Sequence, residues 1–301
     1  MILVAGSTGF VGRSVVAQLA KEQPGQVRAL VRNNSKGGEA LRQMSGVEVV
    51  AGDVLDTAAL ARAMTGVETV LDFAAVTANF KNKQNLYEKV NSEGTRNLVA
   101  AAQTAGVKRF VLGSGLGTVE GKPGSYMRTR WESEEAVRNS QMAWTILQPS
   151  IMFGKGSEFF EAQARIIKIA PFAPVIGNGK TRFQPIFVED YARCAVLTIA
   201  DQTKIGQKLA LGGSEYFTYQ ELINMICRVL GKKRLKLYLP LWAAGIQARL
   251  FNLLPKPPLT PATLELFDFD NITPDPQVIE HQYHFKPMRL QDYLDREGIQ
   301  V

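Results

Sequence analysis

The first twenty residues, MILVAGSTGFVGRSVVAQLA (1–20), decide the fold of this chain. An apolar run is followed by three glycines, Gly6, Gly9 and Gly12, and then by an amphipathic helical pattern. Gly6 permits a tight turn, Gly9 lets the backbone approach an anionic group, and Gly12 lets a helix pack closely on a strand. The stretch predicts a strand, a phosphate-binding turn and a helix, the arrangement that binds a dinucleotide. A purely structural turn is the alternative interpretation.

The same rhythm continues through the first half of the chain. Further apolar runs predict strands at 26–32, 47–53, 69–75, 109–114 and 143–150. These runs are rich in Val, Ile, Leu and Phe without polar alternation, which is typical of strands covered on both faces. Helical patterns lie between them. The alternation predicts an α/β fold with a doubly wound parallel sheet.

The rhythm changes after Pro149. TYQELINMICRVLG (218–231) predicts a helix that Thr218 caps and Gly231 ends, and many prolines follow it. Residues 151–301 therefore predict a smaller, mostly helical C-terminal lobe that provides substrate or partner contacts. We expect this lobe to be interleaved with the dinucleotide-binding domain, residues 1–150, in one compact unit.

Composition narrows the function classes. The chain has 301 residues, of which 46% are hydrophobic and 21% charged, as in ordinary globular proteins. Cys194 and Cys227 lie far apart in apolar helical patterns, which indicates reduced thiols and a cytoplasmic protein. His281 and His284 have no cysteine beside them, so we expect no metal site and no Ser-His-Asp triad. Because the first predicted strand begins at Met1, we expect no targeting peptide in front of it. No apolar run reaches the ~20 residues that cross a bilayer.

The net charge of +7 favours anionic partners such as phosphates or an acidic membrane surface. Nucleic acid would also suit a basic protein. We do not expect it as a partner, because the basic residues are scattered and no DNA- or RNA-binding motif is present.

The end of the second predicted strand distinguishes between the two nicotinamide dinucleotides. An acidic residue there would bind the ribose hydroxyls of NAD, whereas a basic residue favours the 2′-phosphate of NADP. The strand ends in LVRNNSKGG (30–38), with Arg32 at its tip, Lys36 nearby and no carboxylate. Arg13 follows the glycines, and a guanidinium group binds phosphate oxygens well. NADP(H) is therefore preferred over NAD(H), and solvated loop charge is the alternative interpretation.

Together these motifs resemble the short-chain dehydrogenase/reductase superfamily, in its extended and atypical branches, which implies a Rossmann sheet. The matching stretches are GSTGFVG (6–12), AGDVLD (51–56), DFAA (72–75), VNSEGTRNLVAAAQTAGVKRFVLGS (90–114), YMRTRWESE (126–134), WTILQPSIMFG (144–154) and NGKTRFQPIFVEDYAR (178–193). Two stretches, FQPIFVED (183–190) and PPLTPATLELFDFDN (257–271), resemble more narrowly the atypical group of the nucleotide-binding accessory subunit of respiratory complex I and its bacterial relatives. In that group the bound cofactor is often structural.

The resemblance implies which positions hold the cofactor. Asp53 and Val54 would flank the adenine, and residues 72–75 would run past the ribose. The full set of expected contacts is Gly6, Thr8, Gly9, Phe10, Val11, Gly12, Arg13, Arg32, Asp53, Val54, Ala74, Ala75, Tyr126, Arg130 and Pro149.

Hydride transfer to a carbonyl also needs a proton donor. Tyr126 and Arg130 are four residues apart and share one helix face, and a cation lowers the pKa of a neighbouring tyrosine from about 10. The usual cation of the family is lysine, and arginine cannot relay a proton because it does not deprotonate. Ser114 at a strand tip completes the expected catalytic set together with Asn91, which by the resemblance matches the helix position that helps to order the site. Extended members often place the acting hydroxyl two residues after Ser114, where this chain has Leu116.

The stretch GKKRLKLYLPLWAAGIQARLFNLLPKPPLTP (231–261) combines a basic cluster with a helix that begins near Pro240. A wide apolar face beside basic residues is typical of a segment that lies on a membrane surface or contacts a membrane complex. A helix buried in the lobe is one alternative, and the wall of a pocket for a quinone or lipid is another.

These observations lead to three hypotheses. The first is an NADP(H)-dependent oxidoreductase that acts on a small hydrophobic carbonyl or quinone-like substrate. The second is a catalytically weak, cofactor-binding accessory or assembly factor of a membrane complex of the respiratory type. The third is a sugar-nucleotide epimerase or dehydratase, against which the apolar C-terminal lobe argues. The expected location is the cytoplasm, with the membrane periphery as the alternative.

Overall fold

The computed structural model describes residues 1–35, 37–251, 257 and 259–300. The chain divides into two compact units. Unit 1 consists of Met1–Val76, Lys83–Gln148 and Val188–Ala210, and unit 2 of Thr77–Asn82, Pro149–Phe187 and Leu211–Val301. The chain thus leaves unit 1 near residue 149 and returns to it for one helix and one strand.

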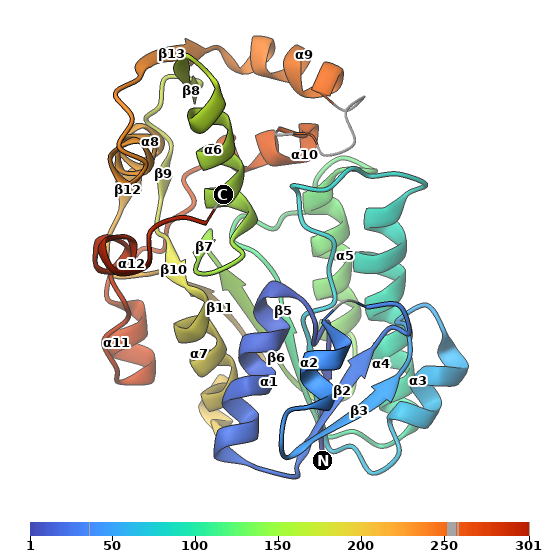
Figure 1. Cartoon of the computed structure of the whole chain (residues 1–301). Helices are drawn as coiled ribbons and strands as arrows, with labels where there is room; N and C mark the ends of the chain where they lie inside the picture. The colour runs from blue at the N-terminus through green and yellow to red at the C-terminus, as the bar shows by residue number, and fades with distance from the viewer. Residues whose placement is uncertain (36, 252–256, 258, 301) are drawn as a thin grey trace. The chain divides into compact units, whose positions relative to one another are not determined.

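A seven-stranded sheet forms the centre of unit 1, in the order β11-β6-β5-β4-β1-β2-β3 (Figure 1). Its strands are β1 (Ile2–Ala5), β2 (Val27–Val31), β3 (Val47–Ala51), β4 (Thr69–Asp72), β5 (Arg109–Gly113), β6 (Ala143–Pro149) and β11 (Gln207–Leu211). All pairs from β3 to β6 are parallel, which confirms the predicted doubly wound sheet. The strand β11 was not predicted, because exposed Gln207 and Lys208 interrupt the apolar pattern of this edge strand.

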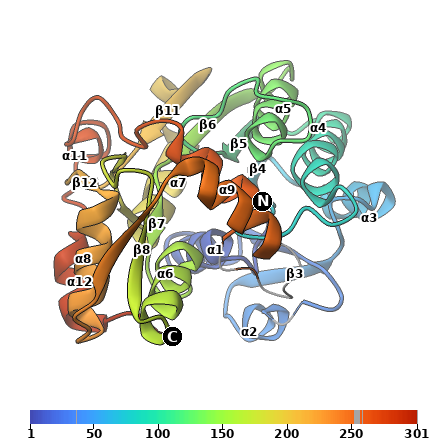
Figure 2. The same cartoon turned by 90° about the horizontal axis from the view of Figure 1, so that it is seen from above.

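Helices cover both faces of this sheet (Figure 2). On one face α1 (Phe10–Glu22) packs against α7 (Val188–Ala200). On the other face lie α3 (Thr57–Ala63), α4 (Gly94–Thr104) and α5 (Tyr126–Arg138), with α4 in contact with both neighbours. A short helix, α2 (Gly38–Arg42), connects β2 to β3, and a single 3-10 turn, η2 (Gln202–Lys204), precedes β11. The helix α4 is entered through a π-helical segment, η1 (Glu88–Glu93), a wide turn that is frequent at functional sites.

The core of unit 1 holds α3, α4 and α5 against the sheet. Leu3 and Phe110 of the strands are fully buried together with Leu60 of α3, Leu98 of α4 and Val137 of α5. Burying side chains of this size contributes about 1.5–3 kcal/mol each. The apolar periodicity of the sequence therefore fixes the position of α5, the helix that carries Tyr126 and Arg130 in the candidate site.

Unit 2 contains three two-stranded sheets and six helices among its described residues. The sheets pair β7 (Met152–Phe153) with β10 (Ile186–Phe187), β9 (Arg182–Phe183) with β12 (Phe217–Thr218), and β8 (Phe172–Ile176) with β13 (Leu235–Leu239). The helices are α6 (Glu158–Ile169), α8 (Tyr219–Val229), α9 (Leu241–Phe251), α10 (Pro261–Leu264), α11 (Val278–Tyr283) and α12 (Leu290–Glu297), with the short turn η3 (Glu265–Phe267) after α10.

Aromatic side chains and local caps stabilise unit 2. Phe183 packs against the rings of Phe159, Tyr219 and Phe267, with ring centroids 5.6–6.2 Å from its own. The predicted helix over 218–231 is confirmed as α8, with a reciprocal capping box between Thr218 and Glu221. In the described part of the chain, no helix is both long enough and apolar enough to cross a membrane.

The glycine turn lies at the switch point of the sheet, between β1 and β4, where ligands of doubly wound folds bind. Gly6 has φ of +70°, and a Cβ atom there would lie 2.4 Å from the carbonyl oxygen of Phe73. A Cβ atom on Gly12 would lie 2.1 Å from the carbonyl oxygen of Gly6. Both overlaps are with backbone, which cannot rotate away. The tight turn and the close helix packing expected of these two glycines are both present.

We expect Gly12→Ala to destabilise the protein by about 2 kcal/mol, because α1 must move to relieve the overlap with Gly6. Gly245→Ala in α9 is the matched control, since a Cβ atom there meets no described atom within 4 Å. This control should gain roughly 0.5–1 kcal/mol from the helix propensity of alanine. Urea unfolding measures both changes. A Gly12→Ala variant as stable as the wild type would contradict the steric argument.

Candidate functional site

The glycine turn leaves the N-terminus of α1 open to an anion. Gly9 is the N-cap residue, no described side chain caps it, and the first turn contains no acidic residue. The Gly9 amide donates to the Gly6 carbonyl over 2.9 Å, and the Ser7 hydroxyl donates to the Leu30 carbonyl over 2.7 Å. These bonds hold the turn closed and attach it to β2. The free backbone N–H groups and the positive end of the helix dipole suit a pyrophosphate group.

A recess of about 530 Å³ lies beside the ends of β2 and β3. Arg32, exposed at the tip of β2, lines it together with Asp53 and Asp56. Both carboxylates already accept backbone amide hydrogens, Asp53 from Leu55 and Asp56 from Ala59, each over 2.9 Å. The cation at the strand tip is therefore the more available of these charges for a ligand. Val54, expected beside the adenine, is buried next to this recess and contributes to the core.

The loop after β2 is tied to the glycine turn, because the Ser35 hydroxyl donates to Thr8 Oγ1 over 2.9 Å. Arg13 lines a different recess, of about 440 Å³, and its guanidinium carbon lies 5.8 Å from the centroid of the Phe10 ring. The two arginines expected near a 2′-phosphate thus line separate recesses. Lys36 lies outside the described residues.

The strand β4 ends in a buried carboxylate. Asp72 Oδ1 accepts the Ala74 amide hydrogen over 2.9 Å, and its Oδ2 accepts the Thr95 hydroxyl over 3.0 Å. Burial raises the pKa of Asp72, and these two hydrogen bonds together with the charge of Arg130 partly offset the rise. Ala74 is thereby fixed at the end of β4, with Ala75 exposed beside it.

Asn91 is buried and fully used in joining three segments. Its Oδ1 accepts the Val76 amide hydrogen over 2.8 Å, and its Nδ2 donates to the Val76 carbonyl over 3.1 Å and to Thr129 Oγ1 over 3.2 Å. The side chain thus joins η1, the chain after β4 and α5. Asn91 therefore holds the backbone after β4 in place relative to α5.

Tyr126 and Arg130 lie one turn apart on α5, which Ser125 caps by accepting the Arg128 amide hydrogen over 3.2 Å. The ring of Tyr126 packs edge-on against the ring of Tyr87, the residue before η1, with the ring centroids 5.6 Å apart. Arg130 is only 2% exposed, and its Nη2 donates to the Gly113 carbonyl at the end of β5. Its Nε has no hydrogen-bond partner among the described residues. Buried donors without partners are rare, and this one suits a hydroxyl-bearing ligand such as a ribose.

Ser114 hydrogen-bonds to a carboxylate that sequence reasoning missed. Its hydroxyl donates to Glu134 Oε1 over 2.5 Å, and Gln148 Nε2 donates to the same oxygen over 2.7 Å. Glu134 is completely buried, with Arg138 at 3.6 Å and Lys208 at 4.0 Å from its other oxygen. The hydroxyl hydrogen of Ser114 is therefore used in the bond to Glu134. The catalytic role expected of Ser114 would require this hydrogen to point toward a substrate. The sequence offers one sign of this carboxylate. Glu134 lies four residues after Arg130 and therefore on the same face of the predicted helix.

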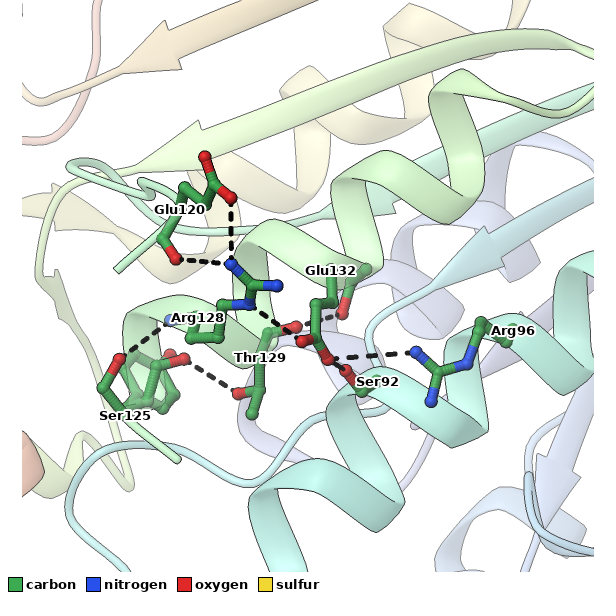
Figure 3. A network of polar contacts seen from close by, with 9 residues as sticks. Ser92, Arg96, Glu120, Ser125, Arg128, Thr129 and Glu132 are labelled. Carbon is green, nitrogen blue, oxygen red and sulfur yellow. Dashed lines mark hydrogen bonds and ion pairs between the residues drawn. The ribbon is translucent and has the colours of Figure 1, made fainter. Parts of the chain in front are cut away.

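A polar network holds α5 against η1 and α4 (Figure 3). Arg128 donates to Glu132 over 2.9 Å and to Glu120 over 3.2 Å. Glu132 also accepts the Ser92 hydroxyl and lies 3.8 Å from the guanidinium group of Arg96. Burial would raise the pKa of Glu132, but the hydrogen bonds from Ser92 and Arg128 outweigh it and place this pKa below its ordinary value. The network orients the face of α5 that carries Tyr126.

The expected site residues gather at the carboxyl ends of the strands. The structure places the glycine turn after β1, Arg32 after β2, Asp53 after β3, Ala74 and Ala75 after β4, and Ser114 after β5, while Pro149 is the last residue of β6. Among the missed residues, Asp72 could have been found as a carboxylate at the end of an apolar strand. Glu132 has no such signal.

Comparison with known proteins gives matches over most of the chain. A family model described as NAD(P)H-binding matches residues 6–161. The mitochondrial NADH dehydrogenase [ubiquinone] 1 alpha subcomplex subunit 9 of Arabidopsis thaliana is 28% identical over 95% of this chain and 73% of its own length. An NAD(P)H azoreductase of Xenophilus azovorans is 30% identical over 77% of this chain and 74% of its own length. These matches confirm the resemblance predicted from the motifs.

A solved structure shares the fold. The NADPH-dependent quinone oxidoreductase of Escherichia coli, solved with NADPH, superposes with a TM-score of 0.77 at 22% identity. The superposition covers 98% of this chain and 99% of the other.

We expect Glu132→Gln to reduce stability at neutral pH by about 0.5–1 kcal/mol, because the network loses its partly exposed central charge. The carboxylate has a lowered pKa in the folded state, so its contribution is present above the unfolded pKa and disappears as the pH falls through the folded pKa. Urea unfolding at pH 7 and at pH 3 tests this. A stability difference of the same size at both pH values would contradict the role of the charge.

Proposed function

This chain belongs to the NAD(P)H-binding family, and we propose that it is an NADP(H)-dependent oxidoreductase acting on a hydrophobic carbonyl or quinone-like substrate. The observation that carries the proposal is the environment of Arg130. This buried cation keeps a donor without a partner among the described residues, on the same helix face as Tyr126. A ribose hydroxyl next to a reacting centre would satisfy it.

The described residues fit a dinucleotide from end to end. The open N-terminus of α1 and the turn Gly6–Gly12 would hold the pyrophosphate. The recess beside Arg32 and Asp53 would take the adenosine end, with Arg32 placed for a 2′-phosphate. Arg130 would hold the ribose at the reacting end. The cofactor, when bound, supplies the hydride.

Tyr126 is the residue that would donate a proton to the substrate oxygen. The permanent charge of Arg130, one turn away, stabilises the phenolate that remains after the proton leaves. Arginine does not deprotonate, so the proton returns to Tyr126 from solvent and not through position 130. Because Ser114 donates to Glu134, Tyr126 is the donor that remains in the expected catalytic set.

The proposed reductase activity has support from one relative. That relative, 30% identical, is named an NAD(P)H azoreductase, whereas the quinone oxidoreductase, at 22% identity, adds support for the fold alone. A sugar-nucleotide epimerase or dehydratase has only the shared fold in its favour, since the structures of that kind are 18–20% identical to this chain.

A second function is favoured by one specific observation. The similarity to the complex I subunit extends over 95% of this chain, further than the azoreductase similarity. In a cofactor-binding accessory factor, the Ser114–Glu134 bond and the arginine at position 130 would cost nothing, because cofactor binding needs neither a free Ser114 hydroxyl nor a proton relay at position 130. Turnover distinguishes the two functions.

We expect Arg32→Glu to weaken NADPH binding by about 10- to 100-fold, the loss of one or two charge-assisted hydrogen bonds, and to change NADH binding little. Arg62→Glu is the control, because Arg62 lines the same recess from α3 and makes the same charge change. Calorimetric titration with each dinucleotide measures both affinities. Equal weakening of NADPH and NADH binding would remove the phosphate assignment.

We expect Tyr126→Phe to lower kcat about 100-fold or more on a quinone or azo substrate found by screening, with NADPH affinity kept. Tyr87→Phe is the matched control, since Tyr87 packs against Tyr126 and lies outside the proposed machinery. Steady-state kinetics and cofactor titration test both variants. Unchanged turnover in Tyr126→Phe would refute its role, and a wild-type chain that binds NADPH but reduces nothing in the screen would favour the accessory function.

A further inference from the structure

The helix α9 exposes large apolar side chains on one face. Trp242 is 72% exposed, Ile246 52% and Leu250 61%, at positions four residues apart. The opposite face carries Ala244 and Ala248, which are completely buried and face the contact with α10. The helix thus presents its larger apolar residues to the outside and its small ones to the protein, the reverse of an ordinary surface helix.

The neighbouring sheet of β8 and β13 adds to this apolar face. Phe172 lies opposite Leu235 in the parallel pair, so both side chains point to the same side of the sheet as Leu237. Leu235 is 85% exposed, and Phe172 and Leu237 are about two-fifths exposed. Only Pro240 separates β13 from α9, and the two elements lie at the same end of unit 2 in Figure 1. We call the six residues Phe172, Leu235, Leu237, Trp242, Ile246 and Leu250 the apolar end.

The segment around the apolar end carries the whole net charge of the protein. Residues 222–264 contain seven lysines and arginines and no aspartate or glutamate. The full chain has 35 basic and 28 acidic residues, so the remaining 28 basic residues balance the acidic ones. Four of the seven basic residues lie together at 232–236, and acidic residues are absent from the whole segment. Lys232, Lys233 and Lys236 are exposed within it.

We propose that the apolar end docks on the surface of a membrane that contains anionic lipids. Exposed Leu, Ile and Trp side chains would enter the headgroup region, where tryptophan is favoured, and the lysines would contact lipid phosphates. A membrane surface with anionic lipids offers an apolar layer to the exposed apolar side chains and negative charge to the exposed lysines. Docking of a second copy is disfavoured, because two acid-free basic segments would repel one another. The proposal is independent of the reductase assignment.

Vesicle flotation with the full chain tests the proposal. We expect binding to vesicles of phosphatidylcholine and phosphatidylglycerol mixed at roughly three to one, and at least about tenfold weaker binding to phosphatidylcholine alone. Lys232→Glu with Lys233→Glu should remove at least about tenfold of the affinity for the anionic vesicles. Trp242→Ser with Ile246→Ser should weaken binding to both vesicle types by about tenfold or more.

Matched controls carry the same changes at exposed positions elsewhere. Lys83→Glu with Lys286→Glu makes the same charge change, and Leu55→Ser with Val119→Ser removes apolar side chains that are 39% and 56% exposed. Both control variants should float like the wild type, and thermal melting should show that all variants are folded.

Three outcomes would overturn the proposal. The first is a wild-type chain that fails to bind anionic vesicles. The second is equal loss of binding in test and control variants, which would indicate a general effect of charge or apolar area. The third is self-association of the wild type in sedimentation velocity, without binding to vesicles, that Trp242→Ser with Ile246→Ser abolishes. The apolar end would then be an interface between copies of this chain.

Discussion

The close backbone contact between Gly6, Gly12 and the end of β4 is the constraint on which unit 1 depends. With 2.4 Å and 2.1 Å left for a Cβ atom, no side chain fits at either glycine, so β1, β4 and α1 are held at one separation. The same contact places the start of α1 at the switch point between β1 and β4 and leaves its N–H groups open. The fold and the proposed phosphate-binding turn therefore depend on the same backbone contact, and we expect a change that disturbs one to disturb the other.

The chemistry of the site is governed by the buried charges around α5. The charge of Arg130 acts on the Asp72 carboxylate, and Glu134 accepts a hydrogen bond from the Ser114 hydroxyl. Arg130 is buried, and its Nε has no hydrogen-bond partner among the described residues. The proposed binding of a cofactor at Arg130 does not depend on proton transfer at Tyr126.

In unit 2 the positive charge depends on missing carboxylates as well as on a basic cluster. Residues 232–236 hold four of the seven basic residues of 222–264, and no carboxylate in that segment offsets them. The exposure of Trp242 and Leu235 gives that segment an apolar centre. Neither property alone favours a membrane, because single exposed apolar residues and solvated lysines are both common on protein surfaces.

Local pattern determined much of this protein, and packing decided the rest. Strands buried on both faces are apolar throughout, so six of the seven strands, the turn Gly6–Gly12 and the capping box of α8 could be predicted from the sequence. The edge strand β11 could not, because only one face of it is buried. The Ser114–Glu134 bond joins residues twenty positions apart, and it depends on the rotation of α5 against β5. Sequence periodicity states which residues avoid water, whereas only the tertiary structure decides which buried donors and acceptors meet, and which apolar face of α9 remains outside.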